Sequence, residues 1–198
     1  LDCLFLFGSS SDTTILTMTY CSDDGIFKLM LEDSGILTTC DIVTLMVDDA
    51  LDRHDLFVSY HDNQEEASCV VKSEFLREIF QDINEVAGAT AVKIALYKKE
   101  MVISTMGSGD SVCDMAIPST SEAFVSFQCA RSKGVSWIYP LASIQLGTKA
   151  LSVASETCLQ VNSEGVMMIQ HQILSKQGKS DTFVDFLAFA EADDTSAM

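Results

Sequence analysis

The chain has 198 residues, of which 47% are hydrophobic, and its formal net charge is -17 at pH 7. That charge argues against nonspecific adhesion to nucleic acid or to an anionic membrane, although the 12 lysines and arginines can still cluster on one surface. Seven cysteines, an odd number with no CxxC pair, indicate reduced and largely buried thiols in an intracellular protein.

The first segment, LDCLFLFGSS (1–10), predicts the end of a helix. Its apolar residues suit the buried side of a helical turn or two, and Gly8 stands where a left-handed C-cap is favoured. A secretory signal would need a basic region and a small-residue cleavage site, which this segment lacks, and seven residues are too few to cross a bilayer. We therefore expect that the chain starts inside a helix and that further residues precede Leu1.

Three strands joined by tight turns are predicted next. The turn signals are Asp24-Gly25 and Ser34-Gly35. The strands are TTILTMTYC (13–21), FKLMLE (27–32) and ILTTCDIVTL (36–45).

Residues 47–65 form an acidic and weakly patterned stretch, which predicts a linker between two domains with one short strand at LFVSY (56–60). The linker carries two His-Asp pairs, His54-Asp55 and His61-Asp62. Their spacing suits no standard zinc motif, so no metal site is predicted here.

A strand at SCVVK (68–72) is followed by the best-defined helix, SEFLREIFQDINEVAG (73–88). Ser73 is its expected N-cap and Gly88 its expected end. The apolar residues at helical spacing are Phe75, Leu76, Ile79, Phe80, Ile83 and Val86. Three strands are predicted after it, at AVKIALY (91–97), MVISTMG (101–107) and DSVCDMAI (110–117).

The same order recurs in the second half of the chain. A strand at EAFVSFQC (122–129) precedes a helix expected over GVSWIYPLASIQLG (134–147), with Trp137, Ile138, Leu141 and Ile144 on one side. Pro140 should kink that helix or end its first turn. The runs that follow are TKALSVASETCLQV (148–161), GVMMIQHQIL (165–174) and TFVDFLAFA (182–190), the last of which suits a helix or a strand equally.

A strand-helix-strand-strand-strand unit thus occurs twice in a domain spanning residues 66–190, and the fold class is α+β. Residues 1–46 supply the back part of the same unit, as the remnant of a first domain. Residues 191–198 form a short acidic tail that we expect to be frayed.

This order of elements resembles that of the sliding clamps, the ring-forming family typified by the proliferating-cell nuclear antigen. Particular segments are similar to those of the Rad-one subunits of the 9-1-1 DNA-damage checkpoint clamp, in order and over the whole length. These segments are LDCLFLFGSS (1–10), EDSGILTTCDI (32–42), SEFLREIFQDI (73–83) and GTKALSV (147–153). The resemblance implies a sliding-clamp fold with antiparallel sheets outside and helices lining a hole, and it implies that the N-terminal part is missing.

The resemblance also implies that subunits join head to tail through sheet edges, so that a closed ring covers edges that would otherwise promote aggregation. The matching edge strands are residues 36–42 and 110–117. The expected interface residues are Ile36, Leu37, Thr38, Thr39, Cys40, Ser111, Val112, Cys113, Asp114 and Met115. Ordinary edge strands covered by loops are the alternative.

DNA inside a clamp is held through phosphate charge and not through base edges. The residues that match the hole-lining positions of the family are Lys72, Arg77, Arg131, Lys133 and Lys149. Four carboxylates are predicted on the exposed face of the same helix as Arg77, at Glu74, Glu78, Asp82 and Glu85. A solvated helix face of mixed charge is therefore the alternative to a DNA-holding one.

The linker matches the connecting loop beneath which replicative clamps dock partner peptides. Val47, Leu51, Leu56 and Phe57 are the residues that border the expected groove, and a plain tether is the alternative.

The expected function is a non-enzymatic subunit of the heterotrimeric checkpoint clamp, with no cofactor and no metal. Its expected partners are two other clamp subunits, double-stranded DNA, an ATP-driven clamp loader and checkpoint and repair proteins, in the nucleus and without a membrane. The alternatives are a homotrimeric replicative clamp and a metal-dependent 3'-5' exonuclease. A nuclease needs several carboxylates that converge on metal ions, whereas the carboxylates of this sequence cluster in turns, on helix faces and in the tail.

Overall fold

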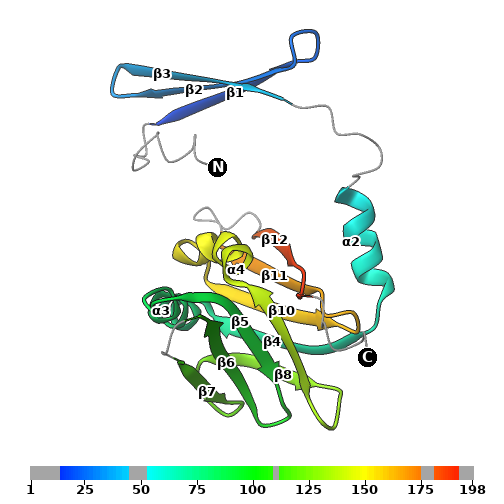
Figure 1. Ribbon diagram of the computed structural model, residues 1–198. Helices are drawn as coiled ribbons and strands as arrows, with labels where there is room; N and C mark the ends of the chain where they lie inside the picture. Colours follow the sequence, from blue (N-terminus) through cyan, green and yellow to red (C-terminus); the bar gives the residue numbers. More distant parts are fainter. Residues whose placement is uncertain (1–13, 45–52, 109–111, 175–180, 192–198) are drawn as a thin grey trace. The chain divides into compact units, whose positions relative to one another are not determined.

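A computed structural model describes residues 14–44, 53–108, 112–174 and 181–191. The chain divides into two compact units, Leu1–Arg53 and His54–Met198 (Figure 1). Each unit is described by itself.

The first unit contains a three-stranded antiparallel sheet in the order β1-β2-β3, as the turn signals predicted. Its strands are β1 (Ile15–Cys21), β2 (Ile26–Asp33) and β3 (Ile36–Val43). Ser34 and Gly35 both have positive φ, at 52° and 80°, which is the backbone conformation that a two-residue hairpin turn of the primed type requires. β2 is the central strand, so β3 lies at an edge of this sheet.

The described part of the second unit contains two antiparallel sheets and three α-helices. Its elements are α2 (Arg53–Asp62), β4 (Glu65–Lys72), α3 (Ser73–Asn84), β5 (Ala89–Leu96), β6 (Glu100–Gly107), β7 (Asp114–Pro118), β8 (Phe124–Cys129), β9 (Val135–Pro140), α4 (Leu141–Thr148), the 3-10 turn η2 (Lys149–Ser152), β10 (Glu156–Asn162), β11 (Met167–Ile173) and β12 (Thr182–Ala188).

The repeated strand-helix-strand-strand-strand order is confirmed as β4-α3-β5-β6-β7 followed by β9-α4-β10-β11-β12. The strand expected to open the second copy, at 122–129, is instead the additional strand β8, and β9 opens that copy. Each copy gives its first strand to the sheet of the other copy. The sheet orders are β7-β6-β5-β9 and β12-β11-β10-β4-β8. In the four-stranded sheet, β9 therefore lies at one edge and β7 at the other.

One hydrophobic core is shared by both sheets and by helices α3 and α4. Leu76, Phe80 and Ile83 of α3 are buried, as their helical spacing predicted, and Leu141 and Ile144 of α4 join them. Gln145 of α4 donates a hydrogen bond from Nε2 to Oδ1 of Asn84 at the end of α3, at 2.9 Å. This bond links α4 to the C-terminal end of α3.

The strand expected at 56–60 is wrong, because these residues form part of helix α2. In a strand Val58 and Tyr60 would lie on the same face. Instead, Tyr60 is 6% exposed and Val58 is 45% exposed, while Phe57, three residues before Tyr60, is half-buried. The aromatic and β-branched composition favoured a strand, but the segment forms a helix because this places Tyr60 on its buried side.

The helix expected over 134–147 is also wrong in its first half. Residues 135–140 form β9, which pairs with β5 so that Trp137 lies opposite Ile94 and Tyr139 opposite Val92. Helix α4 begins only after Pro140. Proline is compatible with the end of an edge strand and with the residue before a helix, so Pro140 separates the two elements and kinks neither. The ambiguous run 182–190 is resolved as a strand, since β12 pairs with β11 along its whole length.

Ser73 does not cap helix α3, contrary to expectation, because it is the first helical residue and Lys72 holds the cap position without a side-chain bond. The buried hydroxyl of Ser73 instead lies 2.8 Å from Oγ1 of Thr157, which lies 2.8 Å from Nδ1 of His171. Nε2 of His171 lies 2.7 Å from the carbonyl oxygen of Gly147. A carbonyl only accepts, so Nε2 carries the proton, and Thr157 donates to Nδ1 and accepts from Ser73. This chain of bonds connects α3, β10, β11 and α4.

In the part of the chain that the structure describes, no helix combines the length and the apolar composition that crossing a membrane would require.

Candidate functional site

Among the described residues no strand pairs with the side of β3 that faces away from β2, so β3 has a free backbone edge in the sheet of the first unit. The amide of Thr44 donates to the carbonyl of Gly25 at 2.8 Å, so the even-numbered residues of the strand direct their backbone groups toward β2. The odd-numbered residues Leu37, Thr39, Asp41 and Val43 consequently direct theirs away from the sheet. All four side chains are exposed and lie on the face opposite Leu29 and Leu31, the buried residues of β2.

Strand β7 offers the corresponding edge in the second unit. The amide of Ser119 donates to Lys99 at 2.7 Å and that of Thr105 donates to Cys113 at 2.9 Å, so the odd-numbered residues of this strand face β6. Asp114, Ala116 and Pro118 therefore direct their backbone groups outward. Pro118 has no N–H to donate, and the outward-facing position at an edge is where a proline costs the sheet no hydrogen bond.

The ten residues predicted for the interface belong to the two edge strands and to the segment that precedes β7. Ile36 to Cys40 lie on β3, and Asp114 and Met115 lie on β7. Val112 and Cys113 directly precede β7, with the side chain of Val112 exposed. Ser111 lies outside the described residues. Met115 packs against the core, so its side chain faces inward while that of Asp114 faces solvent.

The residues predicted to face DNA belong to two places in the fold, the start of α3 with the neighbouring η2 and the turn between β8 and β9. Lys72 and Arg77 come together at the start of α3, around a hollow of about 360 Å³. The other residues that line this hollow are Glu74, Leu151, Ser152, Ala154 and Ser155. Lys149 is exposed on η2, which supplies two of these lining residues.

Arg131 and Lys133 lie in the turn between β8 and β9. The six residues of β9 separate this turn from α4, which is roughly 20 Å of extended chain. Arg131 forms an ion pair with Glu66, whose side chain is only 8% exposed. An arginine that neutralises a buried carboxylate is less available to a phosphate group.

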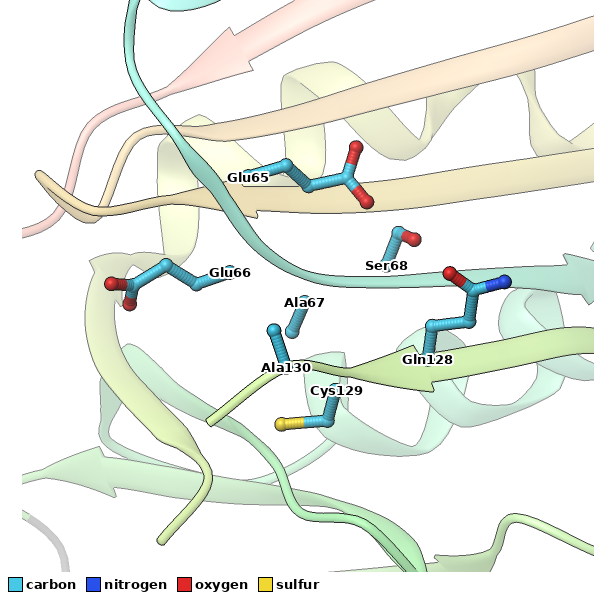
Figure 2. Close-up of a pocket in the computed structure, with 7 residues that line it drawn as sticks. All are labelled: Glu65, Glu66, Ala67, Ser68, Gln128, Cys129 and Ala130. Carbon is cyan, nitrogen blue, oxygen red and sulfur yellow. The ribbon is translucent and has the colours of Figure 1, made fainter. Parts of the chain in front are cut away.

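Glu66 belongs to a hollow of about 420 Å³ where β4 begins and β8 ends. Figure 2 shows that the side chains of Glu65 and Glu66 point away from each other there. The Oε2 atom of Glu66 is buried and has no hydrogen-bond partner among the described residues. Sequence reasoning missed Glu66, because nothing in an EE pair at the start of a strand distinguishes a buried carboxylate from a solvated one.

The exposed face of α3 is predominantly acidic. Arg77 shares it with four exposed carboxylates, Glu74, Glu78, Asp82 and Glu85, as the helical spacing predicted. The positive charge near this face is therefore confined to the end with Lys72 and Arg77.

Helix α2 borders a third hollow, of about 320 Å³. It is lined by Ser59, Tyr60, Asn63, Asn162, Glu164, Val166 and Phe189. Of the predicted groove residues, Val47 and Leu51 lie outside the described residues, the side chain of Leu56 is not described, and Phe57 lies half-buried on α2. Sequence reasoning missed Tyr60, Asn162 and Phe189, which only the fold brings together.

Asn162 is the polar residue buried deepest in this hollow. Its Oδ1 accepts the backbone amides of Glu164 at 3.1 Å and Val166 at 2.9 Å, while its Nδ2 has no partner among the described residues. Burial raises the pKa of the Tyr60 hydroxyl well above its usual value, so that group stays neutral. The hollow is thus uncharged apart from Glu164 and has one free amide donor.

No group of three or more histidine, cysteine or acidic side chains that could hold a metal ion occurs among the residues that the structure describes. His61 is exposed at the last turn of α2, and His171 belongs to the buried hydrogen-bond chain.

The family model described as "Repair protein Rad1/Rec1/Rad17" matches residues 1–173. A curated protein named cell cycle checkpoint protein RAD1 from Mus musculus is 27% identical over 183 residues, which are 90% of this chain and 62% of that protein. The protein of the same name from Homo sapiens is 25% identical over 182 residues, which are again 90% of this chain and 62% of that protein. The chain thus spans 62% of the length of the curated relatives that it matches. With the antiparallel sheets, the family match confirms the predicted clamp fold.

Proposed function

The chain belongs to the Rad1/Rec1/Rad17 family of repair proteins, and from this membership we propose that it is a non-enzymatic subunit of a heterotrimeric checkpoint sliding clamp. The ring would encircle duplex DNA at damage sites in the nucleus after an ATP-driven loader has opened it. It would then recruit checkpoint signalling and repair proteins.

The observation that supports ring assembly best is the pair of free strand edges, β3 in the first unit and β7 in the second. A chain with two different free edges can join head to tail, and such a contact closes into a ring when the rotation suits. The outward backbone groups of Leu37, Thr39 and Asp41 can pair with a neighbour without breaking any bond within this chain. The interface residues predicted from the resemblance belong to this proposal.

A loose hold on DNA is the second element of the proposal. Lys72, Arg77 and Lys149 would contact phosphate, whereas Arg131 is paired with Glu66 and Lys133 shares its turn. The acidic face of α3 repels phosphate along the rest of the helix. The ring would therefore retain DNA by topology, with this subunit adding a small electrostatic contribution.

Replacing Arg77 by alanine in the assembled ring should weaken duplex binding a few-fold and lower the slope of log affinity against log salt by about 0.9, since one phosphate contact is lost. Binding should be measured by fluorescence anisotropy across a salt series. The matched control is Lys98→Ala, which removes one positive charge in the turn between β5 and β6. If the two substitutions weaken binding equally, Arg77 contributes only to the overall charge and makes no phosphate contact of its own.

Docking of partner peptides is the third element. The hollow between Tyr60, Val166 and Phe189 has apolar walls, and Nδ2 of Asn162 is available to a carbonyl acceptor. An extended peptide with an apolar side chain fits these properties. The groove predicted along the linker at Val47, Leu51, Leu56 and Phe57 belongs to the same proposal.

The experiment that tests the proposal is the native mass and subunit composition of the complex that the full-length gene product forms in nuclei. A one-to-one-to-one complex of three different chains of similar size is the expected result. Three copies of one chain would indicate a replicative-type ring instead. A monomer with metal-dependent exonuclease activity would overturn the clamp proposal.

A further inference from the structure

The two free edges carry one carboxylate each, at Asp41 on β3 and Asp114 on β7. Asp41 lies opposite Lys28 of β2, with Nζ and Oδ2 at 3.7 Å. Asp114 lies opposite Ser104 of β6, which brings no charge. Both carboxylates are on the exposed face of their strands, and both belong to residues whose backbone groups point outward.

Pairing between β3 of one copy and β7 of another can be worked out from these positions. Every strand pair within the described residues is antiparallel, and antiparallel pairs are the more stable kind per residue. In such a pair the outward-facing residues of the two strands lie directly opposite each other, with their side chains on the same face. The exposed faces of the two sheets then become continuous, and so do the apolar faces.

When Val112, which directly precedes β7, is counted with the strand, the register with the greatest overlap places the two carboxylates opposite each other. In that register Leu37 faces Pro118, Thr39 faces Ala116, Asp41 faces Asp114 and Val43 faces Val112. A shift of two residues in either direction loses one of these pairs and leaves the carboxylates as diagonal neighbours. Like charges directly opposite each other across a strand pair are destabilising, and diagonal like charges repel more weakly because they are farther apart.

We propose that β7 pairs with a strand from a different polypeptide that places a lysine or arginine opposite Asp114, and that Asp41 and Asp114 together disfavour pairing between copies of this chain. This inference rests on the proposed function, since it assumes that these edges join subunits. It specifies the chemistry of the neighbour. Lys28 partly compensates Asp41, so Asp114 has the greater need of a basic partner. A repulsive contact of this kind selects partners by excluding the wrong one.

Asp114→Lys should convert the repulsive pair into an attractive one between copies of this chain. We expect the variant of the full chain to self-associate at least roughly tenfold more tightly than the wild type at low salt, and the gain to shrink as salt rises. Native mass spectrometry and sedimentation across a concentration series measure this. The double variant Asp41→Lys with Asp114→Lys restores like charges and should lose the gain. Asp82→Lys on α3 makes the same change of net charge away from both edges and should have no such effect.

A wild-type chain that forms trimers by itself under the same conditions would overturn the inference, and so would an Asp114→Lys variant that associates no more tightly than Asp82→Lys. The complex isolated from nuclei separates this failure from failure of the proposed function. If three different chains are recovered but the charge substitutions have no effect on self-association, the ring stands and the charge inference falls. If no ring is recovered at all, the proposed function falls first.

Discussion

Replacing His171 by alanine is expected to lower the free energy of unfolding of the second unit by about 3 kcal/mol or more. The substitution leaves a cavity at a fully buried position, and it removes the partners of Thr157 and of the Gly147 carbonyl. It also disconnects α4 from the hydrogen-bond chain that reaches Ser73 at the start of α3. Urea unfolding followed by tryptophan fluorescence measures the effect on this unit alone, since Trp137 is the one tryptophan of the sequence and packs against the same core.

The matched control is His61→Ala, the same substitution at an exposed histidine of the same unit. We expect it to change the free energy of unfolding by less than about 0.5 kcal/mol. Similar losses at the two positions would contradict the role assigned to the buried chain.

The same histidine should make stability depend on pH. Burial lowers the pKa of His171, although the hydrogen bond to Gly147 and the charge of Asp185 oppose the shift. The unfolded chain therefore binds a proton near the ordinary value of about 6.5, while the folded chain binds it only at lower pH. The stabilisation is fully present above about pH 6.5 and is lost as the pH falls from there toward the folded pKa.

Comparison of the wild type with His171→Phe between pH 7.5 and 5 isolates this contribution, because phenylalanine keeps an aromatic ring at this position and cannot titrate. The wild type should lose stability more steeply, by at most about 1.4 kcal/mol per pH unit for this one group. If stability falls equally steeply with pH in the two proteins, His171 binds its proton equally well in the folded and in the unfolded chain.

If β3 joins a neighbouring subunit as proposed, a proline at Thr39 is expected to prevent that contact while leaving the fold intact. The N–H of Thr39 points away from β2, so proline removes no bond within the sheet but removes a donor from the middle of the free edge. We expect the affinity for the neighbouring subunit at this edge to fall about 100-fold or more, and the contact at β7 to be retained. Co-purification of the variant with the other two subunits, followed by native mass, measures both contacts.

Thr39→Ala is the control, because it shortens the same side chain and keeps the N–H group. Its assembly should match that of the wild type, and the circular dichroism spectra of all three proteins should agree. A Thr39→Pro chain that forms the complete ring would show that β3 is not a subunit edge.

Local sequence patterns were sufficient to predict the turns and helices that depend only on residues close together in the chain. The hairpin turn at Ser34-Gly35 follows from residues that tolerate positive φ, and the amphipathic face of α3 follows from the spacing of Leu76, Phe80 and Ile83. The repeated order of strands and helices, and with it the α+β class, follows from the same patterns. The acidic face of α3 was predictable too, because a helix places residues three and four apart on one side.

Tertiary packing determined the secondary structure and the partners of segments whose local sequence pattern was ambiguous or uninformative. Residues 56–60 have the composition of a strand, but packing of Tyr60 makes them part of a helix. Residues 135–140 suit a helical stripe, but β5 offers them an edge to pair with. The partner of Arg131 is a carboxylate 65 positions earlier in the chain. Which residues of β3 and of β7 direct their backbone groups outward follows only from the strand pairing within each sheet. The energies of such long-range pairings depend on which surfaces meet, and a periodic pattern along one segment carries no information about that.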